Sequence, residues 1–278
     1  MNSQTLKSIA VRTVKPRVSP TTWNTLRGRG KAASDAVATT RDRYRWSRAS
    51  LTDIAIHFDT DKWGGHRYTP HYEHHLKKWR TDNFTLFEIG IGGYAHKREG
   101  GASLRMWKAF FPKANIVGLD IEDKSFVDED RIKSYRGSQT DEALIARIAS
   151  EAGPIRVVVD DGSHRPEHIR ETFRILFPLL EEGGIYAIED TQTSYWPRWG
   201  GSVDRSDPTT TMALVKDLID GLNYEEFLDD GYEPTITDRT VVGIHAYHNL
   251  VIIEKGVNAE GTNRSPREYD YVTAPIST

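Results

Sequence analysis

The spacing of apolar residues along the chain changes character near Asn83. Upstream of this point, residues 1–20 show no helical periodicity and predict a poorly ordered segment, whereas residues 21–50 predict interrupted helical segments. Residues 51–58, LTDIAIHF, have the spacing of a short amphipathic helix. Pro70 then opens a second helix, because proline is well tolerated in a first turn. This part of the chain therefore predicts a helical arm followed by two short helices.

Beyond Asn83, short apolar runs alternate with amphipathic segments. The runs predict strands over 85–90, 115–121, 131–135, 155–161 and 183–190, and the segments between them predict helices over 102–111, 141–150 and 167–182. Continuous apolar runs suit strands that helices cover on both faces, as in a parallel sheet. Residues 240–256 instead predict two strands joined by a tight turn. Seven strands, mostly parallel and closed by an antiparallel hairpin, favour a methyltransferase-type α/β sheet over that of a dinucleotide dehydrogenase.

Composition narrows the class of protein. The 278 residues are 37% hydrophobic and 28% charged, which is ordinary for a globular protein. The chain has no cysteine, so disulfides, thiolate nucleophiles and cysteine-based zinc sites are excluded. No run of about 18 apolar residues is present, which excludes a transmembrane helix. The N-terminus also lacks the features of a signal peptide, and we expect a cytoplasmic protein.

Charge is distributed unevenly between the arm and the rest of the chain. Residues 1–50 hold 11 Lys and Arg against 2 acidic residues, and the remaining residues hold 26 against 38. Such an arm could contact an anionic membrane or a nucleic acid. No aromatic-basic repeat or nucleic-acid motif accompanies it, however. We therefore predict no nucleic-acid partner, and an arm (1–50) that packs on the acidic catalytic domain (51–278) or on a neighbouring subunit.

The first strand end carries a glycine-rich turn, FEIGIGGY, at residues 87–94. Ligands of open α/β sheets bind beyond the carboxyl ends of the strands, and glycines allow a close backbone approach. Gly90, Gly92 and Ala95 nominally satisfy the dinucleotide motif G-x-G-x-x-G/A, but a polar loop separates them from the next helix. Glu88 would also repel a diphosphate. It suits a cationic sulfonium ligand that carries an ammonium group.

Later strand ends extend the same predicted site. Asp120 can accept hydrogen bonds from both hydroxyls of a ribose. Ser138 and Gln139 are placed to address an adenine edge, although simple helix capping is the alternative for Ser138. Together these strand ends favour S-adenosylmethionine as the ligand. The predicted cofactor-binding residues are Tyr68, Glu88, Gly90, Gly92, Ser103, Asp120, Ser138, Gln139 and Asp160.

A carboxylate cluster is predicted where the fourth and fifth strands end. Asp161 follows one strand, and Glu189 and Asp190 follow the next. Neighbouring parallel strands finish about 5 Å apart at one edge, so these three side chains can converge. Crowded carboxylates repel one another, and a hard divalent cation such as Mg²⁺ or Mn²⁺ relieves the repulsion. Capping of the following segments is the alternative, and it is the simpler account of Asp160.

The stretch HRPEH fits the zinc-peptidase pattern H-x-x-E-H. Pro166 must lie in the first turn of a helix, so His164 precedes that helix and cannot share a face with His168. The zinc interpretation therefore fails. A neutral imidazole at His164, three residues past a predicted metal ligand, can instead accept the proton of a substrate hydroxyl whose pKa a metal lowers. A structural histidine is the alternative.

Several motifs together resemble a known family: TDKWGGHRYTPHYEHH, FEIGIGGY, GGASLRMWKAFFPKANIVGLDIEDKS, VVVDDGSH and IEDTQTSYWPRWGG. They resemble bacterial sugar O-methyltransferases of the macrocin and mycinamicin group over about residues 51–255, and more distantly the cephalosporin hydroxylase group. The resemblance implies a class I S-adenosylmethionine-dependent methyltransferase (Rossmann-like) fold and Mg²⁺-dependent methylation of a sugar hydroxyl. It implies Asp161, Glu189 and Asp190 as Mg²⁺ ligands and His164 as the base. Glu73 would be an auxiliary catalytic carboxylate, and a solvated helix acid is the alternative.

The acceptor is expected beside the predicted metal. Tyr195, Trp196 and Trp199 can stack on sugar rings, and the neighbouring proline and glycines favour a surface loop over core aromatics. His66 and Tyr68 could reach either cofactor or acceptor. The macrolide enzymes carry a longer N-terminal domain, which helps to shape the substrate site, so the resemblance does not fix the acceptor. The acceptor sugar could belong to a macrolide, a glycolipid or a polysaccharide. A metal-dependent hydroxylase and a non-catalytic S-adenosylmethionine-binding subunit are the alternatives, and we expect a homodimer or homotetramer.

Overall fold

The computed structural model describes residues 46–93, 99–229 and 231–263. The chain divides into two compact units, Met1–Ala49 and Ser50–Thr278. The predicted helical arm lies almost entirely outside the described residues, so the description below concerns the second unit. Among the described residues, no helix has both the length and the apolar character needed to cross a membrane.

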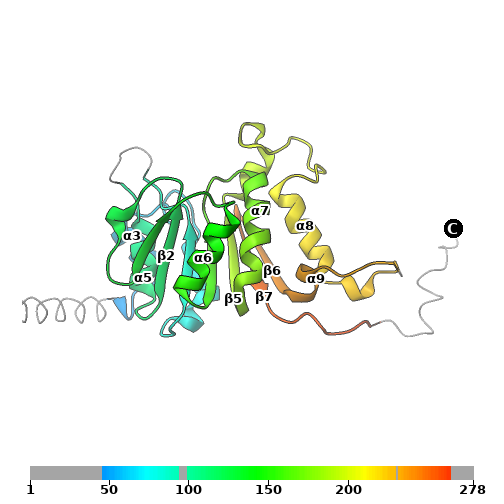
Figure 1. Ribbon diagram of the computed structural model, residues 1–278, viewed down its shortest axis with the longest axis horizontal. Coiled ribbons are helices and arrows are strands. Elements are labelled where there is room, and N and C mark those ends of the chain that lie inside the picture. The colour runs from blue at the N-terminus through cyan, green and yellow to red at the C-terminus, as the bar shows by residue number, and fades with distance from the viewer. Residues whose placement is uncertain (1–45, 94–98, 230, 264–278) are drawn as a thin grey trace, which may run out of the picture. The chain divides into compact units, whose positions relative to one another are not determined.

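A seven-stranded sheet forms the centre of the second unit (Figure 1), with the strand order β3-β2-β1-β4-β5-β7-β6. The first five strands are parallel, and β7 is antiparallel to both β5 and β6. The predicted mostly parallel sheet with a terminal antiparallel hairpin is therefore confirmed. The strands are β1 Thr85–Ile89, β2 Asn115–Asp120, β3 Ile132–Arg136, β4 Ile155–Asp160, β5 Leu180–Glu189, β6 Val241–Tyr247 and β7 Leu250–Lys255.

Helices and short helical turns connect the strands. α3 packs on α5, and α7 contacts both α6 and α8; in Figure 1, α6 and α7 lie in front of the sheet. The α-helices are α3 Leu51–Phe58, α4 Thr69–Leu76, α5 Ala102–Phe110, α6 Glu142–Ala152, α7 Pro166–Leu176, α8 Thr211–Gly221 and α9 Ile236–Thr240. The 3₁₀ turns are η2 Lys77–Trp79, η3 Ser125–Val127, η4 Phe177–Leu179, η5 Thr191–Tyr195, η6 Pro197–Trp199 and η7 Tyr224–Glu226.

The order in which successive strands join the sheet reverses between β1 and β4. From β1 the chain runs through β2 to β3 at one edge, and α6 then returns it to β4 on the other side of β1. This reversal is the switch point at which open α/β sheets bind their ligands. Every residue of both strands is buried except half-buried Arg156 in β4, and the strands are mostly apolar, with Glu88 of β1 and Asp160 of β4 as buried acids. The switch point therefore lies on a rigid part of the core.

The predicted helix over 167–182 is wrong at its end. It begins at Pro166, as expected from proline in a first turn, but it ends at Leu176. Pro178 has no backbone N–H and cannot continue an α-helix, so the chain passes through a 3₁₀ turn there. Leu180 already belongs to β5 and pairs with Ile155 of β4. The amphipathic sequence pattern therefore extends beyond Leu176, where the α-helix ends.

Candidate active site

The carboxyl ends of β4 and β5 bring two predicted metal ligands together. β4 ends at Asp160 and β5 at Glu189, and the two strands pair in parallel. Asp161 and Glu189 both accept a hydrogen bond from a single atom, Nζ of Lys62, at 2.8 Å each. The strand ends therefore converge, and a lysine lies between them.

Lys62 was not predicted as a site residue. It comes from the TDKWGG loop between α3 and α4, and its side chain is fully buried. A third carboxylate, Glu88 of β1, places its Oε1 3.1 Å from the same Nζ, without the alignment of a hydrogen bond. Tyr72 of α4 donates a hydrogen bond to Glu189 at 2.6 Å. We call Lys62, Tyr72, Glu88, Asp161 and Glu189 the inner cluster.

Burial and charge compete within the inner cluster. Burial lowers the pKa of Lys62, but the three surrounding carboxylates outweigh it and hold the pKa well above its usual value. The ammonium therefore stays charged. Burial, together with the charge of Asp161, raises the pKa of Glu189, and burial also raises that of Glu88. One ammonium thus offsets only part of the charge of three carboxylates, and further positive charge would stabilise the cluster.

A second, partly exposed group of side chains adjoins the inner cluster. Asp190 Oδ1 accepts a hydrogen bond from the Tyr68 hydroxyl at 2.8 Å and lies 3.5 Å from His66 Nε2. Asp190 Oδ2 lies 3.7 Å from His164 Nε2. Asp161 of the inner cluster also adjoins this group. We call His66, Tyr68, Asp161, His164 and Asp190 the outer cluster. The Asp190 and His164 side chains are 18% and 20% exposed, so a ligand can reach them.

The backbone at this edge is strained where the chemistry is expected. His164 has a φ of 55° and Asp190 a φ of 52°, and both values lie in the left-handed region that non-glycine residues rarely adopt. Gly90 also has a positive φ, and a Cβ on it would lie 2.0 Å from the Asp161 carbonyl oxygen. Strain of this kind persists only where the surrounding structure enforces it, and it concentrates at functional sites. The turns after β1, β4 and β5 therefore hold their side chains in fixed positions.

The outer cluster fits a divalent cation. Asp161, His164 and Asp190 each offer one ligand atom, and these atoms all lie within 4.8 Å of one another. Carboxylate oxygens are ligands that hard divalent cations prefer, and excess negative charge remains after Lys62 is counted. Glu189 is the third predicted metal ligand, and its Oε1 is held by Lys62 and Tyr72. Its role as a ligand stays a prediction.

A cavity of about 180 Å³ opens at the ends of β1, β2 and β3. Four predicted cofactor-binding residues line it, namely Gly90, Asp120, Ser138 and Gln139. Both oxygens of Asp120 accept backbone hydrogen bonds, from Ile91 and Glu122 at 2.9 Å each. A small, mostly apolar cavity with a few polar groups, walled by three successive strand ends at the switch point, is where the sequence predicts the adenosine part of a ligand.

Other predicted cofactor-binding residues face inward. Ser103 donates a hydrogen bond to Glu88 Oε2 at 2.9 Å, and Glu88 is fully buried. Asp160 accepts hydrogen bonds from Tyr186 at 3.2 Å and from Gln139 at 3.3 Å, and burial raises its pKa to about 7. In this structure these residues support the site from behind, and their direct contact with a cofactor stays a prediction.

Gln139 also supports the turn that carries His164. Its Oε1 accepts a hydrogen bond from the Ser163 backbone at 2.8 Å, and its Nε2 donates one to Thr172 of α7 at 3.0 Å. His168 bonds with Ser163 Oγ at 2.9 Å from within α7, whereas His164 precedes the helix. The two histidines of HRPEH thus lie on different elements, which confirms that the peptidase pattern does not apply.

The remaining predicted residues lie at the periphery. Glu73 accepts a hydrogen bond from the backbone N–H of Leu51 at 2.8 Å, so its observed contact is with the first turn of α3. Gly92 has a φ of 72° and open space where a Cβ would be. Tyr195, Trp196 and Trp199 are 45%, 47% and 39% exposed. The Trp199 ring centroid lies 6.0 Å from that of His164, so the aromatic surface begins beside the outer cluster.

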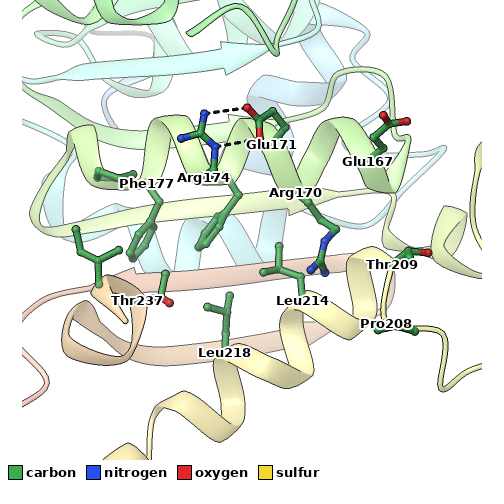
Figure 2. Close-up of a pocket in the computed structure, with 13 residues that line it drawn as sticks. Glu167, Arg170, Glu171, Arg174, Phe177, Pro208, Thr209, Leu214, Leu218 and Thr237 are labelled. Atoms are coloured by element: carbon green, nitrogen blue, oxygen red, sulfur yellow. Dashed lines mark hydrogen bonds and ion pairs between the residues drawn. The ribbon is translucent and has the colours of Figure 1, made fainter. Parts of the chain in front are cut away.

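A larger groove of about 880 Å³ lies elsewhere, between α7, α8 and α9. Figure 2 shows Leu214 and Leu218 of α8 pointing toward α7, where Arg174 pairs with Glu171. The predicted catalytic, metal-binding and cofactor-binding residues all lie outside this groove. Its size therefore does not identify it as the active site, because the strained turns and clustered charges lie at the sheet edge.

Comparison with known proteins agrees with this fold. Demethylmacrocin O-methyltransferase of Streptomyces fradiae is 46% identical over 252 residues, covering 88% of this chain and 64% of that protein. Mycinamicin VI 2''-O-methyltransferase of Micromonospora griseorubida is 45% identical over 217 residues, covering 77% and 54% respectively. The solved structure of the MycE methyltransferase of the mycinamycin pathway, in complex with Mg and SAH, has a TM-score of 0.77 at 44% identity and covers 81% of this chain and 59% of that chain. No protein-family model matches the chain.

The strand order, the terminal hairpin and the ligand-side acids define a class I methyltransferase fold. Over the residues that they share, the chain is a homologue of the sugar O-methyltransferases of the macrocin and mycinamicin group. The resemblance seen in the sequence motifs is thereby confirmed. The chain spans little more than half the length of most of these relatives, from 54% to 64%, so activity and acceptor are taken up as a proposal.

Proposed function

We propose that this protein is an O-methyltransferase that uses S-adenosylmethionine and a divalent cation, most simply Mg²⁺, to methylate a sugar hydroxyl. The observation that carries the proposal is the outer cluster, which places an imidazole within 4.8 Å of two carboxylates at the carboxyl ends of β4 and β5. The names of the relatives support the acceptor class. Two tetracenomycin enzymes of Streptomyces olivaceus, 44% and 42% identical to this chain, are named for methylation of a rhamnosyl unit.

The chain's own residues divide the work between them. When bound, S-adenosylmethionine supplies an electrophilic methyl group, and Mg²⁺ lowers the pKa of the acceptor hydroxyl. His164 Nε2 takes the hydroxyl proton as the oxygen forms its bond to the methyl carbon and the carbon–sulfur bond breaks. Asp190, 3.7 Å away, stabilises the imidazolium that results. Tyr68 and His66 contact the other carboxylate oxygen of Asp190 and hold it in place.

Separate groups of residues would hold the ligands. Asp161, Asp190 and Glu189 are proposed for the cation. The cavity beside Gly90 and Asp120 is proposed for the donor. The exposed aromatic rings of Tyr195, Trp196 and Trp199 are proposed for the acceptor sugar, because aromatic faces pack well against the apolar face of a sugar ring.

The role of His164 is tested by the variant His164→Ala. We expect the turnover number to fall by about 10²-fold or more, because loss of a general base typically costs 10²- to 10⁴-fold. Donor affinity, measured calorimetrically with S-adenosylhomocysteine, should stay within about twofold. His57→Ala, an exposed histidine on α3, is the matched control and should retain full activity. Loss of donor binding in His164→Ala would assign the residue a structural role instead.

The cation is tested by removal and return. We expect EDTA to abolish methylation of a rhamnosylated or macrolide acceptor, followed as a mass gain of one methyl group, and added Mg²⁺ to restore it. A product that gains one oxygen atom would indicate the hydroxylase alternative. Donor binding without any product, across a panel of glycosides, would indicate a non-catalytic subunit.

We further propose that the protein works in the cytoplasm as a homodimer or homotetramer. The absence of cysteine from the whole chain supports a reducing compartment. Light scattering on the purified full chain, coupled to size-exclusion chromatography, measures the oligomeric state directly. A monomer at micromolar concentration would contradict this part of the proposal.

A further inference from the structure

A second cluster of possible metal ligands joins α4 to the β6–β7 hairpin. His75 Nδ1 lies 3.5 Å from Glu254 Oε1, and His245 Nε2 lies 3.2 Å from the same oxygen. The two imidazole rings are 4.4 Å apart between centroids. One ligand atom from each of the three residues lies within 4.8 Å of the others. None of these residues belongs to the inner or the outer cluster.

The hairpin turns two of these side chains toward each other. His245 pairs with Ile252 and Gly243 pairs with Glu254, so His245 and Glu254 lie diagonally on one face of the hairpin. A Cβ on Gly243 would lie 3.6 Å from Glu254 Oε2 and 3.7 Å from His245 Nε2. Both side chains therefore lie above Gly243, which has no side chain of its own. A third ligand from α4 can approach them there.

His75 supplies the third ligand from a fixed position. It is 6% exposed, and its Nε2 lies 2.9 Å from the hydroxyl of Tyr247. A hydrogen bond on one ring nitrogen selects the tautomer and turns the other nitrogen, here Nδ1, toward the metal position, as second-shell partners do in known metal sites.

We propose that His75, His245 and Glu254 form a binding site for a divalent transition metal of the Zn²⁺ class, separate from the catalytic cation. Two imidazoles and one carboxylate suit Zn²⁺ and its neighbours in the first transition row, whereas Mg²⁺ prefers oxygen ligands. The metal would join α4 to the hairpin. The same helix carries Tyr72 of the inner cluster and begins just after Tyr68 of the outer cluster, so the metal fixes the helix on which both hydroxyls depend.

The test is calorimetric titration of the full chain with ZnCl₂ in excess MgCl₂, which occupies the oxygen-rich catalytic site. We expect one equivalent of Zn²⁺ to bind. In His245→Ala and Glu254→Gln, affinity should fall by more than the roughly 100-fold that marks the upper range for loss of a second-shell partner. His248→Ala, an exposed histidine in the turn of the same hairpin, and Asp190→Asn should both retain wild-type affinity.

Two outcomes would overturn the site. One is wild-type protein that takes up no Zn²⁺ under these conditions. The other is Zn²⁺ binding that survives His245→Ala and disappears in Asp190→Asn, which would assign the metal to the catalytic cation site. If His245→Ala fails to fold, His245→Gln is compared with wild type by Co²⁺ absorption. Intense visible bands in wild type that are absent from the glutamine variant support the site, and bands of equal intensity in both contradict it.

Discussion

The inner and outer clusters lie side by side at one sheet edge and share Asp161, yet they solve the problem of crowded carboxylates differently. The inner cluster is buried and contains its own cation, Lys62, within 3.1 Å of three carboxylates. The outer cluster is about one-fifth exposed, and the described residues around Asp190 are two imidazoles and a hydroxyl. The inner cluster contains a cation of the chain itself, which offsets part of its negative charge, whereas the outer cluster is open to ligands.

This difference indicates a structural role for the inner cluster and a ligand-binding role for the outer cluster. A buried ion pair contributes little net stability compared with apolar packing, but loss of one partner is severe because the other charge stays buried. The inner cluster therefore fixes the relative positions of the α3–α4 loop, β1, β4 and β5. The outer cluster keeps its side chains in strained turns at the surface, where an acceptor and a cation can reach them. Variants that affect one cluster and spare the other test this division.

Lys62→Met should give the largest effect, because it removes the only ammonium among the described residues of the inner cluster. We expect the free energy of unfolding, measured by urea denaturation, to fall by about 3–5 kcal/mol. Lys133→Met is the matched control. Lys133 pairs with Asp128 at 2.6 Å, but its side chain is 61% exposed, so its loss should change stability by less than about 1 kcal/mol. Equal effects of the two variants would contradict the importance of the buried ammonium.

Asp160 shows what happens to a buried carboxyl beside the inner cluster that forms no ion pair with Lys62. Burial raises its pKa to about 7 from an ordinary value of 3.8, so the folded protein holds a proton that the unfolded chain releases above pH 3.8. Stability from this proton is complete below about pH 4 and is lost as pH rises toward 7. A shift of this size is worth a few kcal/mol.

Asp160→Asn keeps the shape and removes the titration. Urea denaturation at intervals between pH 4 and pH 7 should show the free energy of unfolding decreasing in wild type and a flatter profile in the variant. The difference should level off above about pH 7. Parallel profiles for the two proteins would mean that Asp160 ionises in the fold at an ordinary pH.

The sequence predicted the outer cluster better than the inner one, for a physical reason. Asp161, His164 and Asp190 follow apolar strands, and the ends of adjacent parallel strands meet at one edge. Pro166 then separated His164 from the helix that follows. Local periodicity and one proline thus suffice to predict that the three residues lie near one another.

Lys62 could not be predicted in this way. It lies 99 residues from Asp161 and 127 from Glu189, in a loop whose polar sequence predicts exposure. The one signal was the excess of carboxylates at the sheet edge, which requires a cation but does not say which. For the same reason Glu88 was expected to meet a ligand's ammonium group, and in the structure it lies against the ammonium of Lys62. The direction in which a buried side chain points depends on packing that periodicity does not encode.

The smallest and sharpest comparison uses two tyrosines at α4. Tyr72 donates a hydrogen bond to Glu189 of the inner cluster at 2.6 Å, and Tyr68 donates one to Asp190 of the outer cluster at 2.8 Å. We expect Tyr72→Phe to lower the free energy of unfolding by about 1 kcal/mol and to leave the Mg²⁺ requirement unchanged. Tyr68→Phe should raise the Mg²⁺ concentration for half-maximal methylation by up to about tenfold, because Asp190 loses the partner that orients it. Its effect on stability should be smaller, since water reaches Asp190. If both variants change stability and Mg²⁺ requirement alike, the two clusters act as one unit, and the division between support and chemistry is wrong.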